Sequence, residues 1–170
     1  MGLTLSSASL AERKIYRSTD IEYINFAHFK NKLLEFASKG KWRSVLHEKF
    51  YNQDFTFHYH NENGVVWDNL DEFENEKEME RSCCRTYLKK LKRLKERYPD
   101  VYGIYPFIVH PDNRGEMTLE QVKRMLPVLE SFYESDKTNY GNKTWNYNFT
   151  ADLIDTFKDV VEKKGKLIFN

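Results

Sequence analysis

The stretch 104–133 constrains the fold of this chain more than any other part of its sequence. An apolar run stops at His110, a polar turn follows, and a helix begins at Thr118. Thr118 and Gln121 form a capping-box pattern, in which each side chain bonds the backbone N–H of the other residue. Gly115 supplies the positive φ that a tight turn needs. The stretch therefore predicts an apolar segment, a tight turn and a capped helix, in that order.

Apolar residues at helical spacing predict further helices on both sides of this stretch. Glycine or proline is expected to end three of these helices, at Gly40, Pro99 and Gly165. Pro127 lies inside the capped helix and is expected to kink it. The predicted helices span residues 21–37, 41–50, 69–97, 118–134 and 151–164, and Thr150 is expected to cap the last of them.

Short runs of β-prone residues predict a small β component. An Asn-Gly pair at 63–64 stands between the runs 55–60 and 65–67, and this pair is a strong local signal for a β-hairpin. Residues 2–6 and 166–170 are interpreted as short strands at the two ends of the chain. Pairing of these two strands would bring the chain ends together.

Two polar stretches, 7–19 and 135–149, are interpreted as loops. The fold is therefore predicted to be mainly α within the α+β class, with about five helices, a short hairpin and paired terminal strands. The chain has 170 residues, which fits a single globular domain over residues 1–170 with one core.

The charge balance argues against a strong electrostatic attraction to nucleic acids or membranes. The chain carries 27 basic and 26 acidic residues, a net charge of +1. No apolar segment approaches the length of a transmembrane helix, and no signal-peptide core is evident. The adjacent Cys83 and Cys84 would form a strained bridge, so both are expected to be reduced. These features predict a cytoplasmic protein with no membrane partner.

The polar turn has part of the pattern of a calcium-binding loop. With Gly115 at the sixth position, Asp112 and Glu116 occupy the third and seventh positions. The first and fifth positions hold His110 and Arg114, and the twelfth position lacks a carboxylate. Calcium requires several charged oxygen ligands, which this loop does not provide. We therefore predict no metal site and no cofactor.

His110, Asp112 and Glu116 can also be interpreted as acid–base or ligand-binding groups. No serine or cysteine nucleophile in a recognisable setting accompanies them, and the chain has no P-loop or dinucleotide-binding motif. The other interpretation is structural: His110 and Asp112 bond the neighbouring backbone and hold the turn.

The second half of the predicted helix 69–97 carries a basic stripe. Arg85, Lys89, Lys92 and Arg93 recur at helical spacing and could contact phosphate groups. Acidic residues lie one turn away, and a solvated helix face explains the same pattern. Nucleic-acid binding is therefore one of three functional hypotheses.

Three segments resemble an uncharacterised family of small bacterial and phage proteins. They are an aromatic helix around Phe26, a turn of the type His-x-Asp-x-x-Gly-Glu before a Pro-interrupted helix, and a last helix that leads into a short strand ending at Phe169. In that family the turn usually carries a second acidic group, where this chain has Arg114. The resemblance implies no activity. It implies a bacterial or phage origin, which argues against acylation of Gly2 even though the first residues match a myristoylation pattern.

The absence of catalytic motifs and the balanced, aromatic-rich composition favour a non-catalytic, cytoplasmic protein that binds another protein. One version is a phage-encoded modulator of a host or defence protein, acting in the host cytoplasm. The alternative is an enzyme or ligand-binding domain that uses His110, Asp112 and Glu116. The second alternative is nucleic-acid binding through the basic helix 85–97.

Overall fold

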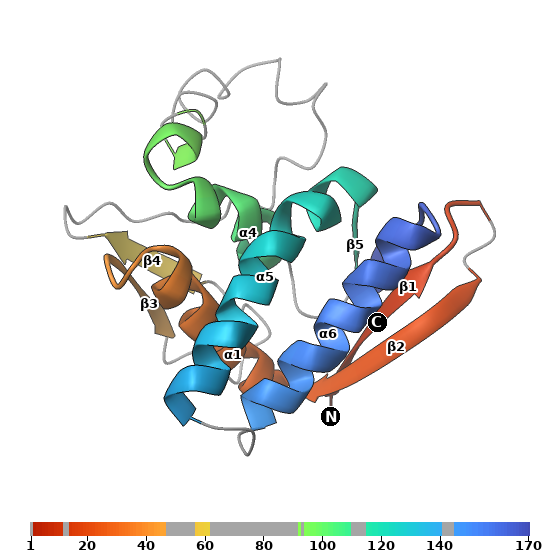
Figure 1. Cartoon of the computed structure of the whole chain (residues 1–170), viewed down its shortest axis with the longest axis horizontal. Coiled ribbons are helices and arrows are strands. Elements are labelled where there is room, and N and C mark those ends of the chain that lie inside the picture. The colour runs from red at the N-terminus through yellow and green to blue at the C-terminus, as the bar shows by residue number, and fades with distance from the viewer. Residues whose placement is uncertain are drawn as a thin grey trace. The chain divides into compact units, whose positions relative to one another are not determined.

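The computed structural model describes residues 2–11, 14–46, 57–61, 92, 94–109, 115–140 and 145–170 (Figure 1). Contacts within the chain divide it into two compact units. The first unit combines the two ends of the chain, Met1–Leu33 and Asp112–Asn170, and the second is Leu34–Pro111. The single globular domain expected from the chain length remains a prediction.

A four-stranded antiparallel sheet forms the base of the first unit within the described residues. The two terminal strands, β1 and β6, pair as predicted, and the strand order β2-β1-β6-β5 places them in the middle of the sheet. The strands are β1 (Gly2–Ala8), β2 (Ile15–Glu22), β5 (Gly115–Met117) and β6 (Lys166–Phe169).

The predicted loop over residues 7–19 is wrong, because most of it belongs to the hairpin formed by β1 and β2. Its polar side chains pair across the two strands: the hydroxyls of Ser6 and Ser18 lie 3.0 Å apart, and Thr4 donates to Asp20 at 2.5 Å. Cross-strand polar pairs stabilise a hairpin without the apolar alternation that usually identifies a strand. Because these side chains are polar, the sequence pattern did not reveal the two strands.

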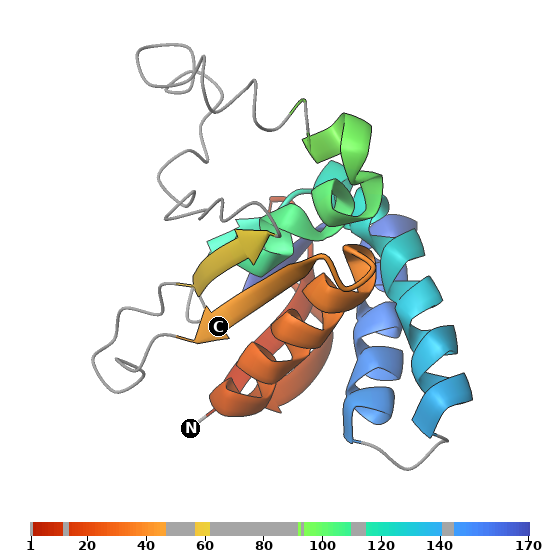
Figure 2. The ribbon, with the colours of Figure 1, turned by 90° about the vertical axis from the view of Figure 1, so that its left-hand side faces the viewer.

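Helices α5 (Leu119–Tyr140) and α6 (Trp145–Glu162) pack against each other, and α6 lies along β1 and β2 (Figures 1 and 2). Helix α1 (Tyr23–Ala37) begins in the first unit, and its first turns join the same core. The buried apolar residues of this core include Leu3, Leu5, Phe26, Phe29, Met117, Met125, Leu129, Phe132, Phe149, Leu153, Phe157, Leu167 and Phe169.

Aromatic rings connect the helices of the first unit. The ring of Phe29 meets Phe132 edge-on at a centroid distance of 5.8 Å and Phe149 at 4.9 Å. Phe26 meets Phe169 at 6.5 Å. Edge-to-face pairs at these distances add to the free energy gained by burying the rings. Residues from α1, α5, α6 and β6 therefore share one core.

The predicted loop over 135–149 is also wrong, because α5 continues to Tyr140 and α6 begins at Trp145. Thr150 was expected to cap the last helix, yet it lies inside α6 with its side chain buried. The apolar face of α6 continues backward to Phe149, which packs on Phe29. This tertiary contact outweighs the weak helix propensity of the surrounding asparagines.

The helix ends predicted at Gly40 and Gly165 agree with the structure, while Pro99, also expected to end a helix, is the first residue of α4. Gly40 has a φ of 77° after α1, and its N–H donates to the carbonyl of Glu35 at 2.8 Å. Gly165 follows α6 and donates to the carbonyl of Val160 at 2.9 Å. Gly115, the first residue of β5, has a φ of 119°, the positive value predicted for it, while the rest of the predicted turn lies outside the described residues. Glycine adopts positive φ at little cost, which explains its position at Gly40 and Gly115.

The second unit contains β3 (Trp42–Leu46), β4 (Phe57–Asn61) and α4 (Pro99–Val109) within the described residues. The helix predicted over 41–50 is wrong for the described residues 42–46, which form β3 and pair with β4 in an antiparallel ladder, while residues 47–50 lie outside the described part of the chain. A short apolar run fits a strand as well as a helix. At residues 42–46 the pairing with β4 favours the strand. Residues 65–67 of the predicted hairpin and most of the predicted helix 69–97 lie outside the described residues.

The described residues thus form an α+β fold. None of the helices in this part of the chain is both long and apolar enough to cross a membrane.

The predicted capping box at the start of α5 is confirmed. The Thr118 N–H donates to Gln121 Oε1 at 2.9 Å, and the Gln121 N–H donates to Thr118 Oγ1 at 3.3 Å. Thr118→Ala is expected to lower the free energy of unfolding by about 1 kcal/mol, because one backbone N–H of the first turn loses its acceptor. Thr118→Ser keeps a hydroxyl acceptor at this position and should retain most of the stability of the wild type. Denaturant unfolding measures both changes, and equal stability of the alanine variant and the wild type would contradict the expectation.

Candidate functional site

The structure tests only part of the predicted acid–base site. His110 and Asp112 lie outside the described residues. Glu116 lies in β5, where its carboxylate forms an ion pair of 2.5 Å with Lys166 of the neighbouring strand β6. The Lys166 side chain is only 11% exposed. In the described part of the chain Glu116 therefore joins two strands, and its participation in a site with His110 and Asp112 stays a hypothesis.

The basic stripe is tested even less. Lys92 is helical and exposed, while Arg85, Lys89 and Arg93 lie outside the described residues. The described part of the chain also contains no group of three or more His, Cys, Asp or Glu side chains that could hold a metal ion. Neither nucleic-acid binding nor the acid–base hypothesis gains support from these residues.

An open groove of about 340 Å³ lies between α5 and α6. Two of its charged side chains, Lys158 and Glu130, form an ion pair at 3.0 Å, and Arg17 pairs with Asp155 at the same distance. Paired charges leave the groove with little preference for a charged ligand. The lining residues are Glu130, Tyr133, Glu134, Ala151, Ile154, Asp155 and Lys158.

The end of the β1–β2 hairpin exposes large apolar side chains. Leu10 is 66% exposed, Ile15 53% and Tyr16 39%. Among the described residues, Ile24 on α1 is the other exposed large hydrophobic residue, at 52%. We call Leu10, Lys14, Ile15 and Tyr16 the hairpin arm. These exposed apolar side chains lie close in sequence at one end of the hairpin, and exposed apolar surface can mark an interaction site.

Backbone contacts shape the arm. The Ser9 N–H donates to the carbonyl of Lys14 at 3.0 Å, and the Lys14 N–H donates to Ser9 Oγ at 3.0 Å. The register pairs Ser7 with Arg17 but Ala8 with Ile15, so Tyr16 is an extra residue on β2, a β-bulge. A bulge redirects a side chain. The ring of Tyr16 lies 4.6 Å from Lys163 Nζ of α6 and 6.0 Å from Lys14 Nζ.

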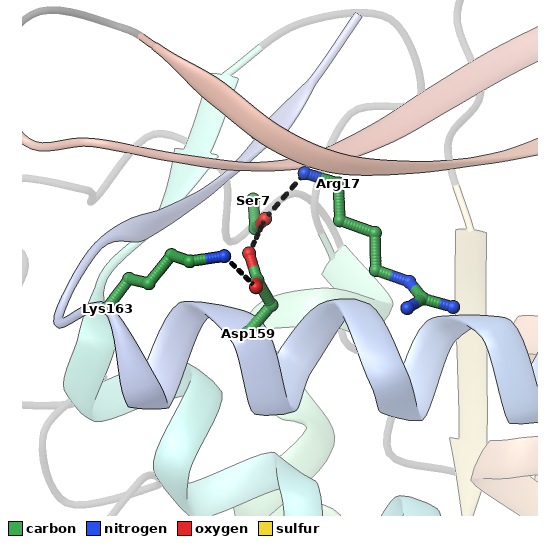
Figure 3. Close-up of polar contacts among 4 residues, drawn as sticks. All are labelled: Ser7, Arg17, Asp159 and Lys163. Carbon is green, nitrogen blue, oxygen red and sulfur yellow. Dashed lines mark hydrogen bonds and ion pairs between the residues drawn. The ribbon is translucent and has the colours of Figure 1, made fainter.

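A polar network fixes the base of the arm to α6 (Figure 3). Ser7 Oγ accepts a hydrogen bond from the Arg17 N–H at 3.1 Å and donates to the carboxylate of Asp159. Asp159 also accepts from Lys163 Nζ. The network thus joins β1, β2 and α6. The Arg17 guanidinium adds an ion pair with Asp155 at 3.0 Å.

The pKa of Asp159 shows how the network is balanced. Burial raises this pKa, but the hydrogen bonds from Lys163 and Ser7 and the charges of Lys163 and Arg17 together leave it below the usual 3.8. A carboxylate of low pKa is a poor general base for the Ser7 hydroxyl. Ser7 is also fully buried, so a substrate cannot reach it. The network therefore holds the arm in place rather than activating a nucleophile.

Asp159 should make the stability of the chain depend on pH. Its pKa is lower in the folded than in the unfolded chain, so its contribution is present above the unfolded pKa and is lost as the pH falls through the folded value. Asp159→Asn is expected to lower the free energy of unfolding at neutral pH by about 2 kcal/mol. The difference from the wild type should shrink below about pH 4.

Denaturant unfolding across this pH range measures the effect, with Asp152→Asn as the control because Asp152 is an exposed carboxylate on the same helix. A difference between Asp159→Asn and the wild type that stays constant from neutral pH to below about pH 4 would contradict the assignment.

Sequence reasoning missed the arm because it interpreted residues 7–19 as a loop. The available signal was the sequence Ile15-Tyr16, two β-prone residues followed by serine and threonine within a polar stretch. Their exposure could not be predicted, since it depends on the bulge and on the contact with α6. No protein family, curated protein or solved structure matches this chain.

Proposed function

We propose that this protein is a non-catalytic interaction protein that binds a partner protein through the hairpin arm. The observation that carries the proposal is the exposure of Leu10, Ile15 and Tyr16 at one end of the hairpin. Tyrosine is enriched in interface hot spots, and exposed apolar surface marks interaction sites. If the chain is phage-encoded, the partner is a host or defence protein, and binding occurs in the cytoplasm.

The arm can supply a useful share of the binding free energy. Full burial of a leucine or isoleucine side chain contributes about 1.5–3 kcal/mol. Ser7 and Asp159 hold the base of the arm, and two hydrogen bonds between Ser9 and Lys14 close it. A surface that is already ordered loses little conformational entropy on binding. An apolar projection held at its base in this way suits insertion into a pocket of the partner.

Site-specific photo-cross-linking tests the proposal. A photoreactive amino acid replaces Leu10 in one sample and Ile24 in a matched control, since both side chains are exposed and apolar. After irradiation in a bacterial host lysate, the expected result is a defined protein adduct from position 10 and none from position 24. Equal adducts from both positions, or none from position 10, would reject the arm as the contact surface.

A further inference from the structure

We infer that the partner of the hairpin arm presents carboxylate groups beside an apolar pocket. This inference rests on the proposed function and specifies the chemistry of the partner. Two ammonium groups flank the exposed Tyr16 ring: Lys163 Nζ at 4.6 Å and Lys14 Nζ at 6.0 Å from its centroid. A partner that buries the arm must therefore also accommodate cations at its edge.

The cations beside the arm differ in what they already bind. Lys163 donates to Asp159, and Arg17 pairs with Asp155, so these two cations have carboxylate partners on α6. Lys14 and Lys164 are exposed and form no ion pair within the described residues. Burying them against an apolar surface without a counter-charge would cost free energy. A carboxylate on the partner removes this cost for Lys14.

An anionic membrane could also attract exposed apolar and basic side chains, but the charge sum of this surface is small. Lys14 of the arm, Arg17 and residues 155–164 together include five cations and three carboxylates, a net charge of +2. Attraction to an anionic bilayer depends on the net charge of the whole surface, with about 1 kcal/mol of binding free energy for each basic residue.

A protein partner, in contrast, can place a carboxylate next to a particular cation and avoid the others. Screening limits charge effects to about 8 Å at physiological ionic strength, so the positions of individual charges matter in a close interface. The five cations are Lys14, Arg17, Lys158, Lys163 and Lys164, and the three carboxylates are Asp155, Asp159 and Glu162. Discrete charges beside the apolar arm therefore favour an acidic protein surface.

Selection from a random peptide library tests the inference. The peptides are selected on the full wild-type chain and then counter-selected against the Leu10→Ser/Ile15→Ser variant, which keeps the charges and lacks the exposed apolar groups. The expected pool combines aspartate or glutamate with a large apolar residue. Its peptides should bind Lys14→Ser about three- to fivefold more weakly than the wild type. Lys123→Ser is the matched control, because Lys123 is an exposed lysine of α5 that pairs with Glu120.

The possible outcomes separate the two proposals. A pool without acidic residues that binds Lys14→Ser as well as the wild type overturns the inference and leaves the proposed function standing. A selection that yields no peptides dependent on Leu10 and Ile15 overturns both. Binding to phosphatidylglycerol vesicles that is lost in Leu10→Ser/Ile15→Ser overturns the inference in favour of a lipid surface.

Discussion

Phe29→Ala is expected to lower the free energy of unfolding by about 4 kcal/mol. Phe29 is fully buried, and its ring meets the edges of Phe132 and Phe149. Truncation removes the buried ring and leaves a cavity where α1, α5 and α6 converge. Because the two neighbouring rings come from two other helices, α5 and α6, the surrounding structure can relax only partly to fill that cavity.

Equilibrium unfolding in denaturant measures this loss, with His28→Ala as the control. His28 is the preceding residue on the same helix and is exposed, so its replacement should change stability by less than about 0.5 kcal/mol. A loss below about 1 kcal/mol for Phe29→Ala would show that the three helices do not share a core at this position.

Gly165→Ala is expected to cost about 3 kcal/mol and to displace the hairpin arm. A methyl group at Gly165 would overlap the carbonyl oxygen of Ala8, at the end of β1. The carbonyl oxygen belongs to the backbone and the methyl group is bonded directly to the backbone Cα, so neither can move away without separating β6 from β1. Because Ser9 follows Ala8 directly and bonds Lys14, the displacement should weaken the closure of the arm. Faster amide hydrogen exchange at Ser9 would report that change.

Gly40→Ala is the matched control, because the two glycines differ in what they require. Gly40 has a φ of 77° and nothing within 4 Å of an added methyl group. Alanine there should cost only the backbone strain of positive φ, about 1 kcal/mol, without any effect on the exchange of Ser9. If Gly165→Ala lowers the free energy of unfolding no more than Gly40→Ala does and leaves the exchange of the Ser9 amide unchanged, the backbone of Gly165 does not lie as close to Ala8 as described.

The sequence predicted those elements that local rules determine. The capping box at Thr118, the glycine after α1 and the apolar faces of α1 and α6 are all short-range patterns, and the structure contains them. Pairing of the two chain ends was also expected, because short strands at both ends need a partner. These features depend on residues close in sequence or on the simple need for strand pairing.

The elements that the sequence analysis missed depend on tertiary contacts. The β1–β2 hairpin is held by polar pairs between Ser6 and Ser18 and by the bond from Ser7 to Asp159. Ser7 and Asp159 are separated by 152 positions, so no local pattern connects them. Strand β3 was mistaken for a helix, because five residues with apolar positions fit either period and only pairing with β4 decides between them.

The candidate surface was unpredictable for the same reason. Leu10, Ile15 and Tyr16 would be ordinary core candidates by composition, and only the folded hairpin shows that they are exposed. The sites predicted at His110, Asp112 and Glu116 and along the basic stripe remain hypotheses, because most of their residues lie outside the described part of the chain.

The affinity of the isolated partner for arm variants tests the central claim most directly. With the cross-linked protein purified, calorimetry compares the wild type with Leu10→Ser/Ile15→Ser and with Ile24→Ser. The account predicts about a hundredfold weaker binding for the arm variant, equivalent to about 3 kcal/mol, and unchanged binding for Ile24→Ser. Equal affinity of the wild type and the arm variant would contradict the claim that this protein acts through its hairpin arm.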